Sequence, residues 1–367
     1  MSDPRLKRLA DVLVRYCLGL KPGQEFRIEG PCLAEPLIQE IYRAALLAGA
    51  YPGTNIGVSG LNPIKYKYSN DEQLKHISEI ERFAIEKLDA IVTLWGDWNT
   101  KELTNADSKR IALSRAARKE FFTRYLERIA RGELHWCGTL FPTHAGAQDA
   151  EMALDEYEDF VFNAMLLDKP DPIAEWQRVS AEQARLVKLL DEVKTMELKT
   201  LDTHLKFNCA GRKWINCDGH ENFPDGEIFT CPIEDSVEGT IRFTFPAIYT
   251  GKEVEDVRLR FEQGKVVEAH ALKGEDFLIA MLDTDEGSRR VGEISFGVNY
   301  GIQRFTRNTL FDEKIGGTMH LAVGASLAEA GGVNQSAIHW DMVCDFRQAG
   351  EVYADGKLIH KNGKFLI

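Results

Sequence analysis

Acidic and imidazole side chains gather beyond residue 220, next to glycine turns and short apolar runs. Glu227 follows a Pro-Asp-Gly turn and opens the run EIFT, and Glu293 lies inside the apolar segment VGEISFG. A carboxylate in such surroundings must be paired, protonated or bound to a metal if it is buried. Taken alone, each glutamate fits an ordinary solvated strand equally well, so neither defines a site by itself.

Two histidines follow these glutamates along the chain. Glu313 and His320 flank a Gly-Gly turn in FDEKIGGTMHLAVG, and His339 lies two residues before Asp341 in SAIHWDMV. Residues i and i+2 of a strand point to the same face, so the imidazole and carboxylate of the second segment would reach one region. A single H-x-D pair recurs by chance, and a lone histidine beside apolar residues is most often structural. The hypothesis of a site therefore depends on all the segments together.

Together these residues predict a centre for two divalent metal ions. Three glutamates, two histidines and one aspartate offer more than four nitrogen and oxygen ligands and no thiolate, which is unlike a structural zinc site. Zinc, cobalt, manganese and magnesium accept overlapping sets of such ligands. Two metals would polarise a carbonyl and lower the pKa of a bridging water, which suits hydrolysis.

The elements that must position these residues fall into two patterns. Helical and strand-like segments alternate in the first half, which predicts a doubly wound α/β domain with a parallel sheet. After about Lys199 the chain changes to short strand-like segments separated by turns, which predicts a strand-rich α+β domain that carries the metal site. We place the boundary near residue 195, giving domains 1–195 and 196–367. Single helices are expected over 71–87, 108–130 and 172–198.

Composition narrows the function class. The formal net charge is -12, and no run of lysine and arginine stands out, so nucleic-acid binding is not expected. Neither a G-x-G-x-x-G after the first strand nor a G-x-x-x-x-G-K-[ST] occurs, so a nucleotide cofactor is unsupported. No apolar stretch of about 18 residues predicts a membrane span. The seven cysteines form no C-x-x-C pair, which indicates reduced thiols and a cytoplasmic protein.

Other hydrolytic classes lack their motifs. The sequence contains neither a G-x-S-x-G nucleophile elbow nor an H-E-x-x-H helix. Cys137 and Cys231 are conceivable nucleophiles, but neither has a recognisable base beside it, and a buried structural cysteine is the default interpretation.

The sequence resembles the metal-dependent aminopeptidases of the aminopeptidase T, aminopeptidase S and PepS family over nearly its whole length. Five segments carry the resemblance: DVLVRYCLGLKPGQEFRIEG, PTHAGAQDAEMALDEYEDFVF, GRKWINCDGHENFPDGEIFTCPIEDSVEGTIRF, FDEKIGGTMHLAVG and SAIHWDMV. The resemblance implies metal ligands at Glu227, at His320, at His339 and Asp341, and at Glu293, which the two metals would share. It also implies two domains and a homodimer.

Two further residues take their meaning from the resemblance. Glu313, in F-D-E-K, matches a glutamate that is either a metal ligand or a general base, so Glu293 and Glu313 are the expected catalytic residues. Leu327 stands where family members commonly carry a tyrosine, seven residues after the histidine of H-L-A-x-G. Leucine has no hydroxyl to donate to an oxyanion. Metal binding is still expected, whereas the family's usual route of peptide turnover is in question.

Three functions are weighed on this basis. The first is a dinuclear aminopeptidase that releases N-terminal amino acids from peptides by metal-activated water. The second is a catalytically weakened homologue that binds metal or peptide. The third is a ring-cleaving dioxygenase with a single iron held by His320, His339 and Asp341. The retained Glu227 and Glu293 argue against the third, since a mononuclear iron would not need them.

Overall fold

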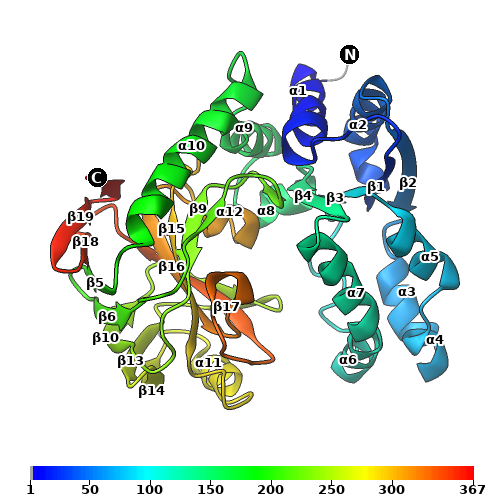
Figure 1. Ribbon diagram of the computed structural model, residues 1–367. Coiled ribbons are helices and arrows are strands. Elements are labelled where there is room, and N and C mark those ends of the chain that lie inside the picture. The colour runs from blue at the N-terminus through cyan, green and yellow to red at the C-terminus, as the bar shows by residue number, and fades with distance from the viewer. Residues whose placement is uncertain (1–2) are drawn as a thin grey trace. The chain divides into compact units, whose positions relative to one another are not determined.

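The computed structural model describes residues 3–367 (Figure 1). The chain forms two compact units: the first comprises Met1–Ile173 and Gly219–Phe223, and the second comprises Ala174–Asp218 and Pro224–Ile367. These units differ from the predicted domains 1–195 and 196–367 in two respects. The helix that follows residue 172 belongs almost wholly to the second unit, and a short later segment returns to the first.

A parallel sheet forms the centre of the first unit. Its strands run in the order β2-β1-β3-β4-β8, and every neighbouring pair is parallel. The chain adds β2 on one side of β1, and then β3, β4 and β8 on the other side. This order is that of a doubly wound α/β fold, as predicted. The strands are β1 (Glu25–Pro31), β2 (Tyr51–Gly57), β3 (Ala90–Trp95), β4 (His135–Leu140) and β8 (Asn222–Phe223).

Helices connect the strands of this first unit, and two of the predicted helices are each divided in two. Ser78 interrupts the first by capping a new helix, its side chain accepting a hydrogen bond from the backbone N–H of Ile80. The second is interrupted at Arg118, which ends one helix and precedes the next. The helices are α1 (Pro4–Val12), α2 (Glu35–Leu47), α3 (Leu61–Tyr68), α4 (Asp71–Lys75), α5 (Glu79–Lys87), α6 (Ser108–Ala117), α7 (Lys119–Ala130), α8 (His144–Asp149) and α9 (Leu154–Ala164).

The second unit is rich in antiparallel strands. An eight-stranded sheet has the order β14-β13-β10-β6-β5-β18-β19-β20, and a five-stranded sheet has the order β17-β16-β15-β9-β7. The first sheet consists of β5 (Thr195–Lys199), β6 (His204–Asn208), β10 (Glu238–Arg242), β13 (Arg258–Glu262), β14 (Lys265–His270), β18 (Glu351–Ala354), β19 (Lys357–Lys361) and β20 (Lys364–Phe365). The second consists of β7 (Ile215–Cys217), β9 (Glu227–Thr230), β15 (Val291–Gly297), β16 (Thr318–Gly324) and β17 (His339–Asp345). A two-stranded ribbon is formed by β11 (Ala247–Tyr249) and β12 (Lys252–Val254).

Three helices accompany these sheets: α10 (Pro172–Leu190), α11 (Glu275–Leu282) and α12 (Thr309–Asp312). The prediction that the first of them continues to residue 198 is wrong, because it ends at Leu190 and residues 195–199 form β5. Met196 and Leu198 point into the core while their neighbours face outward, and β5 pairs with both β6 and β18. Pairing with the neighbouring β6 and with the distant β18 outweighs the helix propensity of this segment. Across residues 3–367, no helix is both long and apolar enough to cross a membrane.

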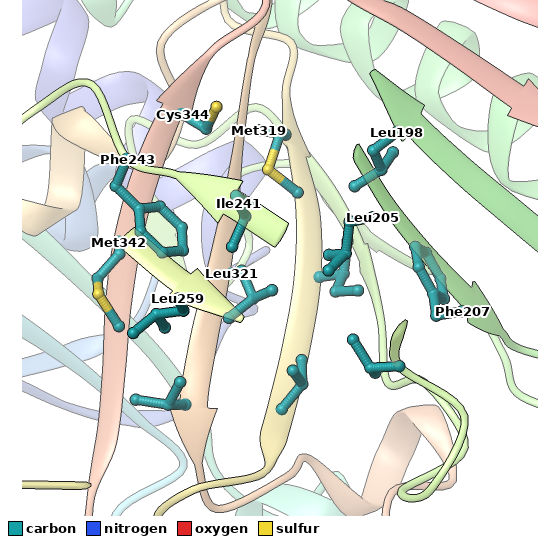
Figure 2. Packing of buried hydrophobic residues seen from close by; sticks show 14 of the residues in the cluster. Leu198, Leu205, Phe207, Ile241, Phe243, Leu259, Met319, Leu321, Met342 and Cys344 are labelled. Carbon is teal, nitrogen blue, oxygen red and sulfur yellow. The ribbon is translucent and has the colours of Figure 1, made fainter. Parts of the chain in front are cut away.

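The two large sheets of the second unit share one apolar core. Figure 2 shows residues of the eight-stranded sheet, such as Leu205 and Leu259, beside Met319, Leu321 and Met342 of the five-stranded sheet. Because side chains alternate along a strand, the residues of β16 between these apolar ones point to the opposite face of the five-stranded sheet. That opposite face carries the candidate site.

Candidate metal centre

Cross-strand register places the predicted site residues in one patch of the five-stranded sheet. Ala322 of β16 pairs with Glu293 of β15 on one side and with Asp341 of β17 on the other. Gly324 pairs with His339 in the same way. The small residues on β16 leave space above the sheet for the longer side chains on either side. His339 and Asp341 share a face, as their spacing predicted.

Five of the predicted residues form two groups that share Glu293. Its Oε1 lies 3.3 Å from Nε2 of His320, and its Oε2 lies 3.2 Å from Nε2 of His339. Glu227 Oε2 is 3.5 Å from the first imidazole, and Asp341 Oδ1 is 3.5 Å from the second. Within each group of three, the potential ligand atoms all lie within 4.8 Å of one another.

Backbone carbonyls orient both imidazoles. Nδ1 of His320 lies 3.0 Å from the carbonyl oxygen of Glu313, and Nδ1 of His339 lies 2.7 Å from that of Ala325. A carbonyl only accepts hydrogen bonds, so each Nδ1 carries the proton and donates it. Each Nε2 therefore faces the carboxylates, which is the usual arrangement of a metal-binding histidine and its supporting partner.

The carboxylates also control the charge of the two rings. Burial lowers the pKa of His320, but Glu293 and Glu227 outweigh it and raise the pKa to about 10. Burial likewise lowers the pKa of His339, while Asp341 and Glu293 raise it to about 12. Without a metal ion, both rings are therefore protonated and carry a positive charge. A metal ion must compete with protons for them.

The side chains present fit a divalent cation. The Oδ1 atom of Asp341 is buried and makes no hydrogen bond within residues 3–367. Leaving a buried carboxylate oxygen unsatisfied is costly, and a cation beside it would remove that cost. Burial raises the pKa of Asp341, but His339 outweighs it and lowers the pKa to about 2, so the carboxylate is ionised and available.

Glu313 follows α12 and reaches the same patch. Its carboxylate, His320 and Asp341 form a further group with ligand atoms within 4.8 Å of one another. Burial raises the pKa of Glu313 to about 8; the positive charge of Lys314 opposes this rise, and the negative charge of Glu227 adds to it. All six predicted site residues therefore lie in one cluster.

Lys314 is a part of this cluster that the sequence analysis missed. Its side chain is fully buried, and its Nζ contacts the carboxylate of Glu313. Nζ also lies 3.4 Å from Glu227 Oε1 and 3.9 Å from Asp225 Oδ1. A lysine followed directly by Ile-Gly-Gly and an apolar strand was the available signal, because such a segment leaves a long side chain no exposed face.

Neighbouring polar groups complete the surroundings. The hydroxyl of Ser295 lies 3.3 Å from Glu227 Oε2 and also donates toward the carbonyl of Ile228 at 3.2 Å. Cys217 lies with Asp225 and Glu227 in another close group, and burial raises the pKa of its thiol well above the usual value. The segments quoted from the sequence contain these residues, but none of them was expected to take part in the site.

The two cysteines considered as nucleophiles are structural in character. Cys137 is buried within β4. Burial raises the pKa of Cys231 to about 11, so its reactive thiolate form is scarce at neutral pH.

Leu327 has a packing role. It is half-buried against a small apolar group that contains Phe229, Cys231 and Ala330. Its carbonyl accepts a hydrogen bond from the Cys231 thiol at 3.5 Å. The adjacent Ser326 hydroxyl donates to the carbonyl of Asn334 at 3.2 Å, so that hydroxyl is already engaged.

Known proteins resemble the chain over its full length. It matches the family described as thermophilic metalloprotease (M29) over residues 2–365. Aminopeptidase 2 of Geobacillus stearothermophilus is 28% identical over 402 residues, which cover 99% of this chain and 95% of that protein. Aminopeptidase T of Thermus aquaticus is 28% identical over 399 residues, which cover 96% and 94% of the two chains.

Solved structures agree with these sequence likenesses. Wild-type AmpT from Thermus thermophilus superposes with a TM-score of 0.87 at 25% identity and covers 99% of each chain. The 2,5-dihydroxypyridine dioxygenase of Pseudomonas putida KT2440 has a TM-score of 0.62 at 15% identity, covering 100% of this chain and 98% of that one, which bears on the fold alone. The resemblance expected from the motifs is confirmed. The chain therefore belongs to the thermophilic metalloprotease (M29) family, a family of peptide hydrolases.

Proposed function

We propose that this protein is a dinuclear metal-dependent aminopeptidase, which releases N-terminal amino acids from peptides. The observation that carries the proposal is the pair of ligand groups that meet at Glu293, one through His320 and one through His339. A carboxylate with one oxygen directed at each group suits a ligand shared by two metals. Relatives that align over nearly the whole chain bear the name aminopeptidase.

The residues proposed to hold the two metals divide as the groups do. Glu227, Glu293 and His320 would hold one ion, and Glu293, His339 and Asp341 the other. Two such ions, when bound, polarise the scissile carbonyl and lower the pKa of a water.

The remaining task of the chain is to move the proton and to hold the substrate amine. Glu313 contacts Lys314 and stands beside both groups without being part of the shared pair, so we assign it the role of general base. Glu293, which would be a ligand of both metals, is the second candidate for this step. A carboxylate of the cluster would pair with the free α-ammonium group of a peptide, which a blocked N-terminus lacks.

The alternatives lack comparable support. A mononuclear iron dioxygenase would use His320, His339 and Asp341, but Glu293 and Glu227 lie directly against these histidines. The structural likeness to a dioxygenase stands at 15% identity and concerns the fold. A weakened homologue that binds metal or peptide without hydrolysing it is distinguished from an active aminopeptidase by the following test.

The test combines metal analysis with turnover. Purified protein is expected to bind two divalent ions in each chain and to hydrolyse amino-acid p-nitroanilides but not their N-acetyl derivatives. Glu293→Gln should reduce metal content and lower turnover by at least about 100-fold, since a shared ligand is lost. Glu262→Gln, an exposed position of β13 in the same unit, is the control and should change neither. Two bound metals with no turnover of any amide would refute the aminopeptidase proposal.

We also propose a homodimer, following the resemblance, and retain the cytoplasmic location as a prediction. The chain has a mass of 41.4 kDa, so light scattering on micromolar protein should give twice that value. A mass equal to one chain would refute the dimer and leave the metal centre untouched.

A further inference from the structure

A pocket lies within the first unit, on one face of the parallel sheet. Its volume is about 460 Å³, which is within the usual range for small-molecule sites. Arg27 and Glu29 of β1 contribute to its floor, with Thr93 of β3 and Trp136 of β4 beside them. Strand register accounts for this floor, because Arg27 pairs with Ile91 and Glu29 pairs with Thr93. None of the proposed metal ligands belongs to this unit.

The floor of this pocket carries charges that have few partners. The side chains of Arg27 and Glu29 are 26% and 32% exposed, and their nearest charged atoms are 3.6 Å apart. Within residues 3–367 the Arg27 guanidinium makes no hydrogen bond, although it has five N–H donors. Glu29 accepts one long hydrogen bond of 3.4 Å from Asn55. Both groups therefore have capacity for a ligand.

The wall of the pocket is apolar and largely aromatic. The helix α7 supplies Phe121, Phe122, Tyr125 and Leu126. Two of these side chains remain accessible to a ligand, since Phe122 is 57% and Leu126 is 49% exposed. The indole N–H of Trp136 on the floor is already bonded to the hydroxyl of Thr93 at 2.9 Å. That indole consequently offers the ligand its ring rather than its donor.

The balance of charge narrows the class of ligand. A second pair of opposite charges, Arg118 and Glu81 at 3.2 Å, lines the same pocket. The formal charges of the residues that line the pocket therefore sum to zero. A phosphate or nucleotide would meet Glu29 and Glu81 as well as the arginines. A simple amine would leave Arg27 without a partner. A suitable ligand has one positive and one negative group close together on an apolar body. Such a molecule can pair with Glu29 and Arg27 and pack against the apolar wall.

We propose that this pocket binds a free amino acid with an aromatic or large aliphatic side chain. Its carboxylate pairs with Arg27, its ammonium group pairs with Glu29, and its side chain packs against α7 and Trp136. Arginine holds a carboxylate through two parallel hydrogen bonds, which gives the contact direction as well as strength. The inference does not depend on the proposed peptidase activity.

Calorimetric titration of the full-length, metal-stripped protein with L-phenylalanine tests the proposal. One site in each chain is expected. Arg27→Gln should weaken binding by about tenfold or more, because a charge-assisted contact is lost. Glu293→Gln, in the metal cluster of the other unit, should leave the affinity unchanged. Loss of binding in Glu293→Gln with retention in Arg27→Gln would overturn the assignment, as would absence of binding to the wild type at millimolar concentration.

Two further measurements test the pocket: a variant that blocks it without disturbing the fold, and ligand analogues that each lack one charge. Leu126→Trp changes an exposed rim residue and should block the pocket without disturbing the sheet, which circular dichroism can verify. Phenethylamine and 3-phenylpropanoate each keep only one charge of phenylalanine, and both should bind more weakly than it does. Equal binding of either analogue would contradict the paired roles of Arg27 and Glu29.

Discussion

Lys314 places a buried positive charge among the carboxylates of the metal cluster. Its ammonium group contacts Glu313 and lies within 4.0 Å of Glu227 and Asp225. Burial lowers the pKa of this ammonium group, but the surrounding negative charges outweigh burial and raise it. The lysine therefore neutralises part of the acidic cluster before any metal binds, which allows the carboxylates to be buried together.

Removal of this buried charge should be costly. Lys314→Met removes the buried positive charge that contacts Glu227 and Glu313, and we expect a loss of about 3–5 kcal/mol in the metal-stripped protein. The matched control is Lys273→Met, since Lys273 pairs with Glu253 and Glu255 but is 61% exposed. An exposed pair of this kind contributes about 1 kcal/mol or less. The measurement is the Tm of each variant by calorimetry. Equal decreases in Tm for the two variants would contradict the role given to Lys314.

Leu327 supports a second prediction at this scale. If turnover suffers from a missing hydroxyl, Leu327→Tyr should raise kcat with metals reconstituted, by up to about 10²–10³. The metals polarise the same carbonyl, which would reduce the gain. Leu327→Phe is the matched control, because it adds the ring without the hydroxyl and meets the same neighbours, Phe229 and Cys231. Equal rates for the two variants would show that the hydroxyl has no function here.

The five-stranded sheet turns separate sequence motifs into one site. The bulge at Gly292 shifts the register of β15 just before Glu293. Bulges often occur beside functional residues because they redirect a side chain. At this position a Cβ atom would lie 2.1 Å from the carbonyl oxygen of Ala325, the same carbonyl that orients His339. The glycine thus allows the loop after β16 to approach β15 and support the histidine.

Gly292→Ala tests this close approach. Strand and loop must separate, which we expect to cost about 1–3 kcal/mol and to reduce metal affinity. Gly53→Ala in β2 is the control, because its Cβ would meet only an ordinary contact at 3.9 Å. Metal titration and thermal unfolding of both variants give the comparison. Unchanged metal affinity in Gly292→Ala would mean that the bulge does not position the site.

Elements of the site differ in how far the sequence could predict them. His339 and Asp341 were predictable as a pair because a strand fixes the direction of residues two apart. The contacts of Lys314 depend on α12 and β9 meeting in space, which no local pattern encodes. The segment of β5 has strong helix formers, yet it forms a hairpin with β6 and also pairs with β18, which lies far along the chain, and this pairing determines its structure. Local patterns therefore predicted the fold class and residues that the structure brings together, and missed the features set by long-range pairing.

At the scale of the whole molecule, the core of the second unit contains a residue that links stability to pH. His360 of β19 is 1% exposed and packs its ring against Phe296, Phe346 and Phe365. Its Nδ1 is buried and makes no hydrogen bond to any other described residue. Burial lowers the pKa of His360 to about 4, so the ring is neutral in the folded protein.

The consequence is a loss of stability in mild acid. An unfolded chain binds a proton at His360 below about pH 6.5, whereas the folded chain resists protonation until about pH 4. The stabilising contribution is therefore complete above pH 6.5 and is lost as the pH falls toward 4, to a limit of about 3 kcal/mol. His360→Phe keeps an aromatic ring in the same pocket and removes the titration, so its Tm should fall less than that of the wild type between pH 7 and pH 5. His270→Phe, at a surface position of the same unit, should follow the wild type, because its side chain is 69% exposed. If His360→Phe loses as much stability on acidification as the wild type, other groups must govern the acid response, with the protonation of the metal cluster the next to examine.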